Sequence, residues 1–411
     1  MKKPNAYDLR LNRLNEASRG HIPDRVPVTA LVETYALAYS GVPLKETQKN
    51  IFKHIKAYGE IYKDVYFDAA FTPCVSHALN LGWTLGSDVF FVSDDGITLQ
   101  HKEYCPMDAS DYAAMAKDPV AFILDEFLPR KFPKFNGTND EQLKAFKSTL
   151  APFVQFALTL MISSLYFRHI LKVPVLSGGS AEMPCDMLFD YTRGFKGTIT
   201  DIRRHPVEVE KTVNALLDYC FDLVKMTQLL MGSTSGNPAW LIDNAINSVI
   251  GSRDPKLLYF PWIFNPCHIP PFLGPEQFDK FYWPTYKAMA EKIHYCGGHM
   301  LTMLEGSWGP HLDRINELPP HSVTFIAEKD DIFELKKKIG KDFCIMGGMP
   351  VEMLRDSSTK ECIDYAKKVI DECAVDGGFI FCTDKVLMSP SDANIKNLRA
   401  VNEFVHVYGQ Y

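Results

Sequence analysis

The 411-residue sequence predicts one α/β domain, a closed (β/α)8 TIM barrel with an N-terminal helical extension and inserted helices. Its length exceeds one small domain of ~100–200 residues but suits a barrel of ~250 residues enlarged by insertions. Short β-branched or apolar runs alternate with longer amphipathic stretches along the chain. No internal repeat, low-complexity tract or Gly/Ser linker divides it. We therefore expect residues 1–411 to form a single domain.

The C-terminal half gives the clearest elements. It contains four strand–helix units in succession, and this order is typical of parallel strands joined by crossover helices. The expected strands are 300–304, 322–327, 343–346 and 378–382, and the expected helices are 277–295, 311–318, 332–339, 361–373 and 393–408.

The N-terminal half adds weaker units, which bring the total to about eight and favour a closed barrel over an open sheet. Pattern alone leaves the open sheet as an alternative. The expected strands are 26–32, 88–92, 173–176 and 239–242, and the expected helices are 44–64, 113–130, 141–170 and 206–230. The inserted helices are expected between about residues 100 and 170.

Composition excludes several classes of protein. Hydrophobic residues make up 46% and charged residues 23%, as in a soluble globular protein and unlike a disordered chain. The 44 Lys and Arg against 50 Asp and Glu give a net charge of −6, so no basic surface points to nucleic acid.

The sequence also predicts a cytoplasmic location. Residues 1–20 lack the continuous apolar stretch of a secretory signal. Residues 148–167 carry no charge, but Pro152, Gln155 and Thr159 among them favour a buried or partly buried helix over a membrane span. The ten cysteines have no regular spacing, which favours reduced thiols or a metal site over disulfides.

Functional groups of a barrel lie at the C-terminal ends of its strands. Each residue there is, taken alone, more often a loop or packing residue, but acids, thiols and aromatic groups occur together at these positions. The strand-end residues are Glu33, Tyr35, Asp94, Asp95, Asp243, Asn244, Glu305, Trp308, Glu328, Met346, Cys382 and Asp384.

Several motifs resemble a known superfamily. The string Gly20-His21-Ile22-Pro23-Asp24-Arg25-Val26-Pro27, which follows a helix, resembles the opening of uroporphyrinogen decarboxylase superfamily members. Later strings resemble its corrinoid-dependent methyltransferases, especially O-demethylase components. These strings are 281–285 (FYWPT), 304–308 (LEGSW), 344–350 (CIMGGMP) and 376–380 (DGGFI). The resemblance covers almost the whole chain and implies a (β/α)8 barrel with the active site in its mouth.

The stretch after the first strand disfavours a decarboxylase. Uroporphyrinogen decarboxylases carry Arg-Gln-Ala-Gly there, and the arginine handles substrate carboxylates. Residues 31–38 here read LVETYALA, with no arginine. A porphyrinogen with eight carboxylates needs cationic partners, because unpaired anions are costly to desolvate.

The resemblance also implies a zinc site. Methyltransferases of this superfamily commonly bind zinc through His-x-Cys at one strand end and Cys at the last one. The literal string His294-Tyr295-Cys296-Gly297 closes a helix at the wrong end of the barrel. Alignment of strand ends instead sets Met303 at the histidine and Glu305 at the first cysteine, as in O-demethylase relatives with a Glu-Gly pair. Cys382 is the expected second ligand, although relatives place their cysteine about three positions later. A metal-free site with a buried free cysteine is the alternative.

His268 is a candidate for acid–base chemistry. It lies in a proline-rich loop, residues 265–272, near a strand end. A neutral imidazole there could ligate metal, and a protonated one could donate a proton to a leaving phenolate. A loop histidine bonded to backbone is the alternative.

The resemblance implies a methyltransferase that moves a methyl group from a small O-methyl compound, such as a methoxylated aromatic, to cob(I)alamin on a separate corrinoid protein. The chain itself has no Asp-x-His-x-x-Gly cobalamin element. Glu305 and His268 are the expected catalytic residues. The expected substrate-binding residues are Glu33, Tyr35, Asp94, Asp95, Met303, Trp308 and Met346.

Two other functions stay open. One is a thiol- or tetrahydrofolate-acting methyltransferase of the same barrel class. The other is a catalytically inactive partner that binds a corrinoid protein, since the usual His is absent and the Cys is displaced. The oligomeric state also stays open, with a homodimer among the candidates.

Overall fold

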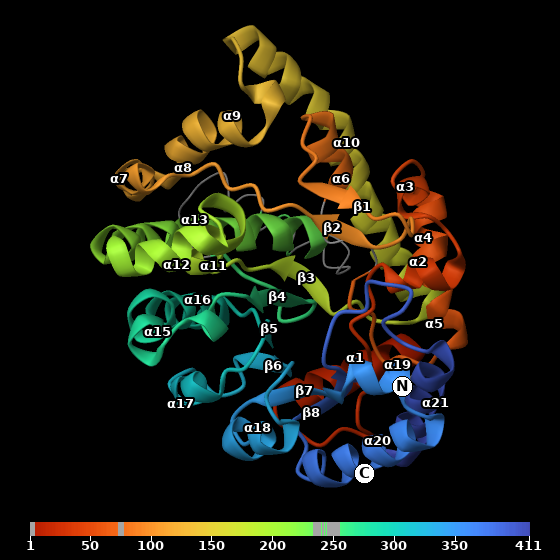
Figure 1. The fold of residues 1–411 in the computed structure, drawn as a ribbon. Coiled ribbons are helices and arrows are strands. Elements are labelled where there is room, and N and C mark those ends of the chain that lie inside the picture. The colour runs from red at the N-terminus through yellow and green to blue at the C-terminus, as the bar shows by residue number, and fades with distance from the viewer. Residues whose placement is uncertain (1–4, 73–77, 233–239, 241, 243, 245–254) are drawn as a thin grey trace.

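Six parallel strands, in the order β3-β4-β5-β6-β7-β8, form the centre of the computed structural model, which describes residues 5–72, 78–232, 240, 242, 244 and 255–411 (Figure 1). Each neighbouring pair is parallel, so every connection crosses over. The strands are β3 Ser177–Ser180, β4 Trp262–Cys267, β5 Met300–Leu304, β6 Val323–Ala327, β7 Cys344–Met349 and β8 Phe379–Thr383.

Two extended segments join the outer strands of this sheet. Residues 26–33 lie along β8, with a parallel bridge between Val28 and Phe381, and residues 67–72 lie along β3, with a parallel bridge between Ala70 and Val175. The segments also meet each other, because the Asp68 amide donates to the Val28 carbonyl at 2.7 Å. They therefore occupy the first two positions of the barrel, and the predicted α/β class is confirmed.

The strands are apolar because both of their faces are buried. Every residue of β5, β6, β7 and β8 is buried, as expected for parallel strands covered by helices. The helices of the C-terminal half surround them (Figure 1). These helices are α15 Pro275–Phe281, α16 Trp283–Tyr295, α17 Leu312–Ile315, α18 Ile332–Ile339, α19 Val351–Asp356, α20 Thr359–Cys373 and α21 Ile395–Tyr408.

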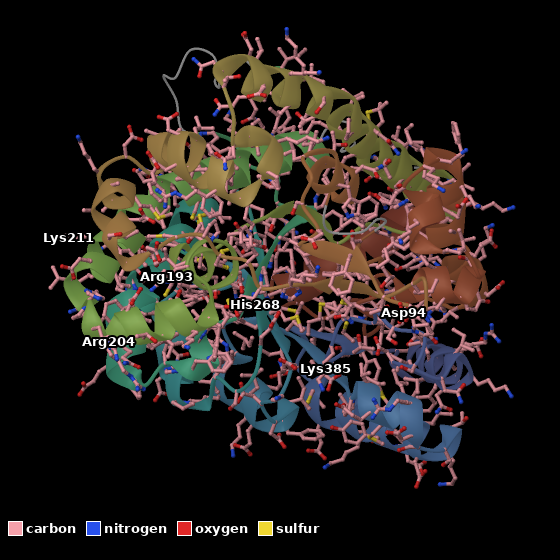
Figure 2. The ribbon with its side chains drawn as sticks, turned by 45° about the horizontal axis from the view of Figure 1, so that its top comes forward. Asp94, Arg193, Arg204, Lys211, His268 and Lys385 are labelled. Carbon is pink, nitrogen blue, oxygen red and sulfur yellow. The ribbon has the colours of Figure 1, made fainter. Side chains whose placement is uncertain are left out.

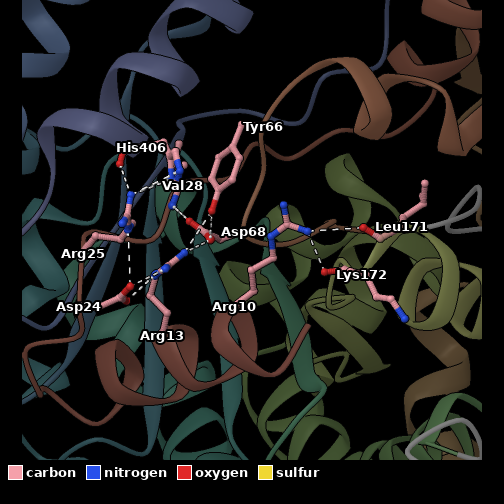
Figure 3. A network of polar contacts seen from close by, with 10 residues as sticks. All are labelled: Arg10, Arg13, Asp24, Arg25, Val28, Tyr66, Asp68, Leu171, Lys172 and His406. Atoms are coloured by element: carbon pink, nitrogen blue, oxygen red, sulfur yellow. Dashed lines mark hydrogen bonds and ion pairs between the residues drawn. The ribbon is translucent and has the colours of Figure 1, made fainter. Parts of the chain in front are cut away.

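The predicted N-terminal extension is helix α1, Ala6–Ser18, and a buried arginine ties it to the barrel. The Arg13 guanidinium donates to Asp24 at 2.7 Å and also pairs with the fully buried Asp68 (Figure 3). Asp68 in turn accepts the Val28 amide at 2.9 Å. Because the buried charges are paired and hydrogen-bonded, α1 fixes the first two barrel positions to each other.

The predicted strand 88–92 was assigned to the wrong place. Its ordered part, β1 Phe90–Val92, pairs antiparallel with β2 Leu99–His101. The two form a hairpin outside the barrel sheet, and the turn composition after β1 marks the hairpin turn. The pattern of a short apolar run ended by a turn did not distinguish the two arrangements.

Two other strand predictions need correction. Residues 173–176 only begin the third barrel position, and β3 extends it to Ser180. In 239–242, Trp240 and Ile242 are helical, and the other two residues lie outside the described residues. The fourth barrel position is taken by β4 instead.

The inserted helices lie where they were expected. Helix α10, Asn139–Tyr166, is the longest of them and starts at a Thr138 capping box. With its continuation to Leu171 it is long and apolar enough to cross a membrane by length and composition, and 22% of its most apolar window is buried. The other helices before β4 are α2 Tyr35–Ser40, α3 Leu44–Thr47, α4 Ile51–Gly59, α5 Ile61–Asp64, α6 Leu79–Thr84, α7 Tyr112–Lys117, α8 Pro119–Phe122, α9 Leu128–Lys131, α11 Pro184–Asp186, α12 Phe195–Arg204 and α13 Pro206–Gly232.

Candidate active site

A cavity of about 480 Å³ lies at the C-terminal ends of the barrel strands. Its volume falls in the range of small-molecule sites, ~300–1,000 Å³. The β1–β2 hairpin and helix α10 contribute to its walls, so the inserted segments help to cover the barrel mouth. The apolar lining residues are Phe71, Phe90, Leu99, Phe156, Leu160, Leu230, Phe264, Pro266, Met303, Val386 and Met388.

The polar groups of the cavity come from several strand ends. Glu33 follows the first barrel segment, Glu182 follows β3, His268 follows β4 and Glu305 follows β5. Among the described residues that line the cavity there is no lysine or arginine. The cavity is therefore apolar with an acidic region, and it does not fit a substrate with many carboxylates.

His268 lies between two carboxylates, near the centre of the molecule in Figure 2. Its Nδ1 is 2.6 Å from Asp190 Oδ2, and its Nε2 is 3.0 Å from Glu305 Oε1. Burial opposes the charge, but the hydrogen bonds to Asp190 and Glu305 outweigh it and raise the pKa of His268 to about 11. Both ring nitrogens can donate only in the imidazolium form. At neutral pH the cluster is a cation held by two anions.

The loop that carries His268 is fixed from below by Asp186. This buried carboxylate accepts the backbone amides of His268 at 3.1 Å and Ile269 at 2.9 Å. Its other oxygen accepts the Tyr282 hydroxyl at 2.8 Å. Burial and the nearby charge of Asp190 raise the pKa of Asp186 to about 8. Asp186 thus positions the loop and does not line the cavity.

Glu305 is oriented by its neighbours as well as by His268. Gly306, directly after it, has φ of +66°, and a Cβ there would lie 2.5 Å from Pro271 Cγ. The turn therefore requires glycine. The Gly306 amide donates to Glu328 Oε2 at 2.6 Å, which holds the turn to the end of β6.

Glu182 was missed by the sequence analysis. It lines the cavity, its Oε1 accepts the Ser180 hydroxyl at 3.4 Å, and its Oε2 is buried without a hydrogen-bond partner in the described part of the chain. Burial, followed by the charge of Asp190, raises the pKa of Glu182 to about 7. Asp190 was missed too, because it lies in a π-helical turn, Met187–Thr192, and not at a strand end.

Four of the predicted site residues line the cavity: Glu33, Met303, His268 and Glu305. The Thr34 amide donates to Glu33 Oε2 at 2.5 Å. Asp94 and Asp95 lie in the hairpin turn and do not line the cavity, and Asp94 is far from His268 in Figure 2. Asp95 accepts the Ile97 and Thr98 amides, each at 2.8 Å, so it stabilises the turn.

The remaining predicted residues belong to the protein interior. Tyr35 is buried and donates its hydroxyl to the Ala393 carbonyl at 2.7 Å. Trp308 is fully buried against Phe278 and Tyr282. Met346 and Cys382 are fully buried in the apolar cluster inside the barrel, and they are absent from the cavity lining.

The donor arrangement does not fit a zinc ion bound by Glu305 and Cys382. Burial raises the pKa of the Cys382 thiol well above its usual range, whereas zinc binds the thiolate. Glu305 is already paired with the His268 cation. In the described residues, no group of three or more His, Cys, Asp or Glu side chains has an arrangement that could hold a metal ion. We derive no step of the chemistry through zinc.

Comparisons with known proteins agree with this fold. Residues 262–408, from the start of β4 into α21, match the family model described as Uroporphyrinogen decarboxylase (URO-D). A solved structure described as a methyltransferase from Methanosarcina mazei superposes with a TM-score of 0.56 at 14% identity, covering 97% of this chain and 98% of that chain. No curated protein sequence matches the chain. By its fold and by the sequence of residues 262–408, the chain is a member of the uroporphyrinogen decarboxylase-like superfamily.

Proposed function

We propose that the protein is a methyltransferase that removes the methyl group of a small O-methyl compound, such as a methoxylated aromatic, and passes it to a reduced corrinoid on a separate protein. The observation that carries this proposal is the apolar cavity of about 480 Å³ with an acidic cluster at one region. The similarity to the methyltransferase from Methanosarcina mazei supports the general class of reaction. Free thiols at all the described cysteines agree with a cytoplasmic location.

The cavity lining selects the type of substrate. Phe71 and Phe264, whose ring centroids are 5.0 Å apart, offer an aromatic wall for a flat ring. The carboxylates of Glu33, Glu182 and Glu305 disfavour a substrate carboxylate, because the lining has no lysine or arginine among its described residues to pair with it. We therefore propose a neutral or cationic methoxy compound.

The side chains at the acidic cluster match the chemistry that ether cleavage requires. Loss of the methyl group leaves negative charge on the oxygen, and a nearby acid lowers the energy of that charge. The Glu182 carboxyl, with a pKa of about 7 and an unpaired Oε2, supplies this proton. Glu305, held by His268, accepts a hydrogen bond from a polar substituent and orients the ring. The reduced corrinoid is a second substrate and takes the methyl group.

A substrate screen tests this proposal. Purified protein is mixed with reduced corrinoid protein and a panel of methoxyarenes, and the demethylated product and the methyl–cobalt absorbance are both measured. We expect stoichiometric formation of phenol and methyl–cobalt with at least one neutral methoxyarene. Binding without turnover would favour an inactive partner protein, and methyl transfer only to a thiol or tetrahydrofolate would favour the alternative methyltransferases.

A further inference from the structure

Helix α10 has its apolar and polar faces reversed with respect to the protein core. Thr149, Thr159 and Ser163 are buried, and the Gln155 side-chain amide donates inward to the Gln48 carbonyl at 2.5 Å. The opposite face exposes a row of large apolar side chains, each 37 to 57% accessible. These residues, which we call the α10 stripe, are Leu143, Phe146, Leu150, Phe153, Val154, Leu158 and Leu165. A helix that packs on a soluble domain normally buries such a face.

The α10 stripe is continuous and large. Its members recur at intervals of three and four residues over most of its length, so they follow one side of the helix. From residue 143 to residue 165 the stripe extends ~33 Å at 1.5 Å per residue. Its exposed side chains present roughly 600 Å² of apolar surface, at the upper limit of the largest patch on a typical monomer. A standard interface buries ~800 Å² per partner, so the stripe with a polar rim reaches that size.

We propose that the α10 stripe packs against the same stripe of a second copy of this chain, with the two helices antiparallel across a twofold axis near Val154. An isologous interface requires one self-complementary patch, which a continuous apolar stripe provides. A helix that lies on a membrane carries lysine and arginine along its polar face. Residues 148–167 contain neither, and the polar side chains of this segment point into the protein.

This interface would connect the second copy to the cavity. Phe156 and Leu160, on the inner side of the same helix, line the cavity. In Figure 1 the N-terminal part of α10 extends beyond the barrel together with α9, so little of the same chain supports it there. A second copy that covers the stripe holds this wall of the cavity in place. The dimer itself does not depend on the proposed methyltransferase activity.

The oligomeric state of the full-length protein tests the proposal. Light scattering after size exclusion should give twice the monomer mass of 46.6 kDa at micromolar concentrations. Phe146→Glu and Leu150→Glu should each give a monomer with an unchanged far-ultraviolet circular dichroism spectrum. Val407→Glu is the matched control, because Val407 is 69% exposed on α21, away from α10, and this variant should stay dimeric.

Cysteine cross-linking keeps the proposal testable where a charged variant fails to fold. In an antiparallel pair the two copies of residue 154 face each other, whereas the two copies of residue 143 lie at opposite ends. Under mild oxidation Val154→Cys should therefore form a cross-linked dimer and Leu143→Cys should not. A monomeric wild type, dimers that persist in both glutamate variants, or a monomer that sediments with phospholipid vesicles would overturn the proposal.

Discussion

The charge of His268 can be tested by removing it. In His268→Gln the imidazolium that lies 2.6 Å from Asp190 and 3.0 Å from Glu305 is replaced by a neutral amide. Two partly buried carboxylates then lose their shared cation. Breaking a buried ion pair costs ~3–5 kcal/mol, and partial solvent access reduces this, so we expect a loss of about 2 kcal/mol in the free energy of unfolding at pH 7.

The pH dependence of this loss follows from the raised pKa. His268 has a pKa of about 11 in the folded protein, above the ~6.5 of an unfolded chain. Its stabilisation is therefore complete below pH ~6.5 and is lost as pH rises toward ~11, because only the unfolded state releases the proton in that interval. The wild-type advantage should shrink by up to ~1.4 kcal/mol per pH unit, and most of it should be gone by about pH 9.

Urea unfolding at pH 7 and pH 9, followed by circular dichroism, measures this difference. His299→Gln is the matched control, because burial lowers the pKa of His299 to about 3 and its Nε2 lies 2.8 Å from the Thr324 hydroxyl. His299 is neutral in both states above pH 7, so the cost of its replacement should be equal at the two pH values. A His268→Gln cost that is also independent of pH would refute the charged bridge.

Four further predictions concern the cavity. Glu305→Gln should lower kcat/KM for demethylation by about 100-fold with an unchanged unfolding midpoint, and near-normal turnover would contradict its role. Because the pKa of Glu182 is about 7, wild-type turnover should fall as pH rises above 7, and Glu182→Gln should be slow and lack this decline in its pH–rate profile. Cys382→Ser should destabilise the protein by ~1–2 kcal/mol and leave kcat/KM within a few fold, whereas a folded variant that loses both zinc and activity would restore the Glu305–Cys382 pair. Addition of a carboxylate to an accepted methoxyarene should raise KM at least ~10-fold in steady-state assays, and equal KM values would contradict the acidic cavity.

The C-terminal half of the fold was predictable because local pattern and final environment agree there. Strands such as β5 and β6 are buried on both faces and appear in the sequence as apolar runs. The helices that follow them are amphipathic and begin with capping residues, as at Ser358 before α20. The N-terminal half was harder, since its first two barrel segments, 26–33 and 67–72, join the barrel through isolated bridges.

The site could be predicted only where a strand end was placed correctly. His268 and Glu305 follow β4 and β5, and the strand-end rule selected both. Glu182 was missed because β3 reads Ser-Gly-Gly-Ser, a composition typical of a turn, so the strand was ended at residue 176. Extension of that strand by four residues would have placed Glu182 at its end. Tyr35 and Trp308 failed differently, because both aromatic rings pack into the interior near the expected positions.

The transfer of a labelled methyl group is the most direct test of the proposed function. The protein is mixed in a single turnover with a methoxyarene that carries a deuterated methyl group and with reduced corrinoid protein, and mass spectrometry follows the label. We predict that the deuterated methyl group appears intact on the corrinoid, with one equivalent of phenol, for the wild type and far more slowly for Glu305→Gln. Phenol without label on the corrinoid, or no phenol from any neutral methoxyarene that binds, would contradict the proposed methyl transfer.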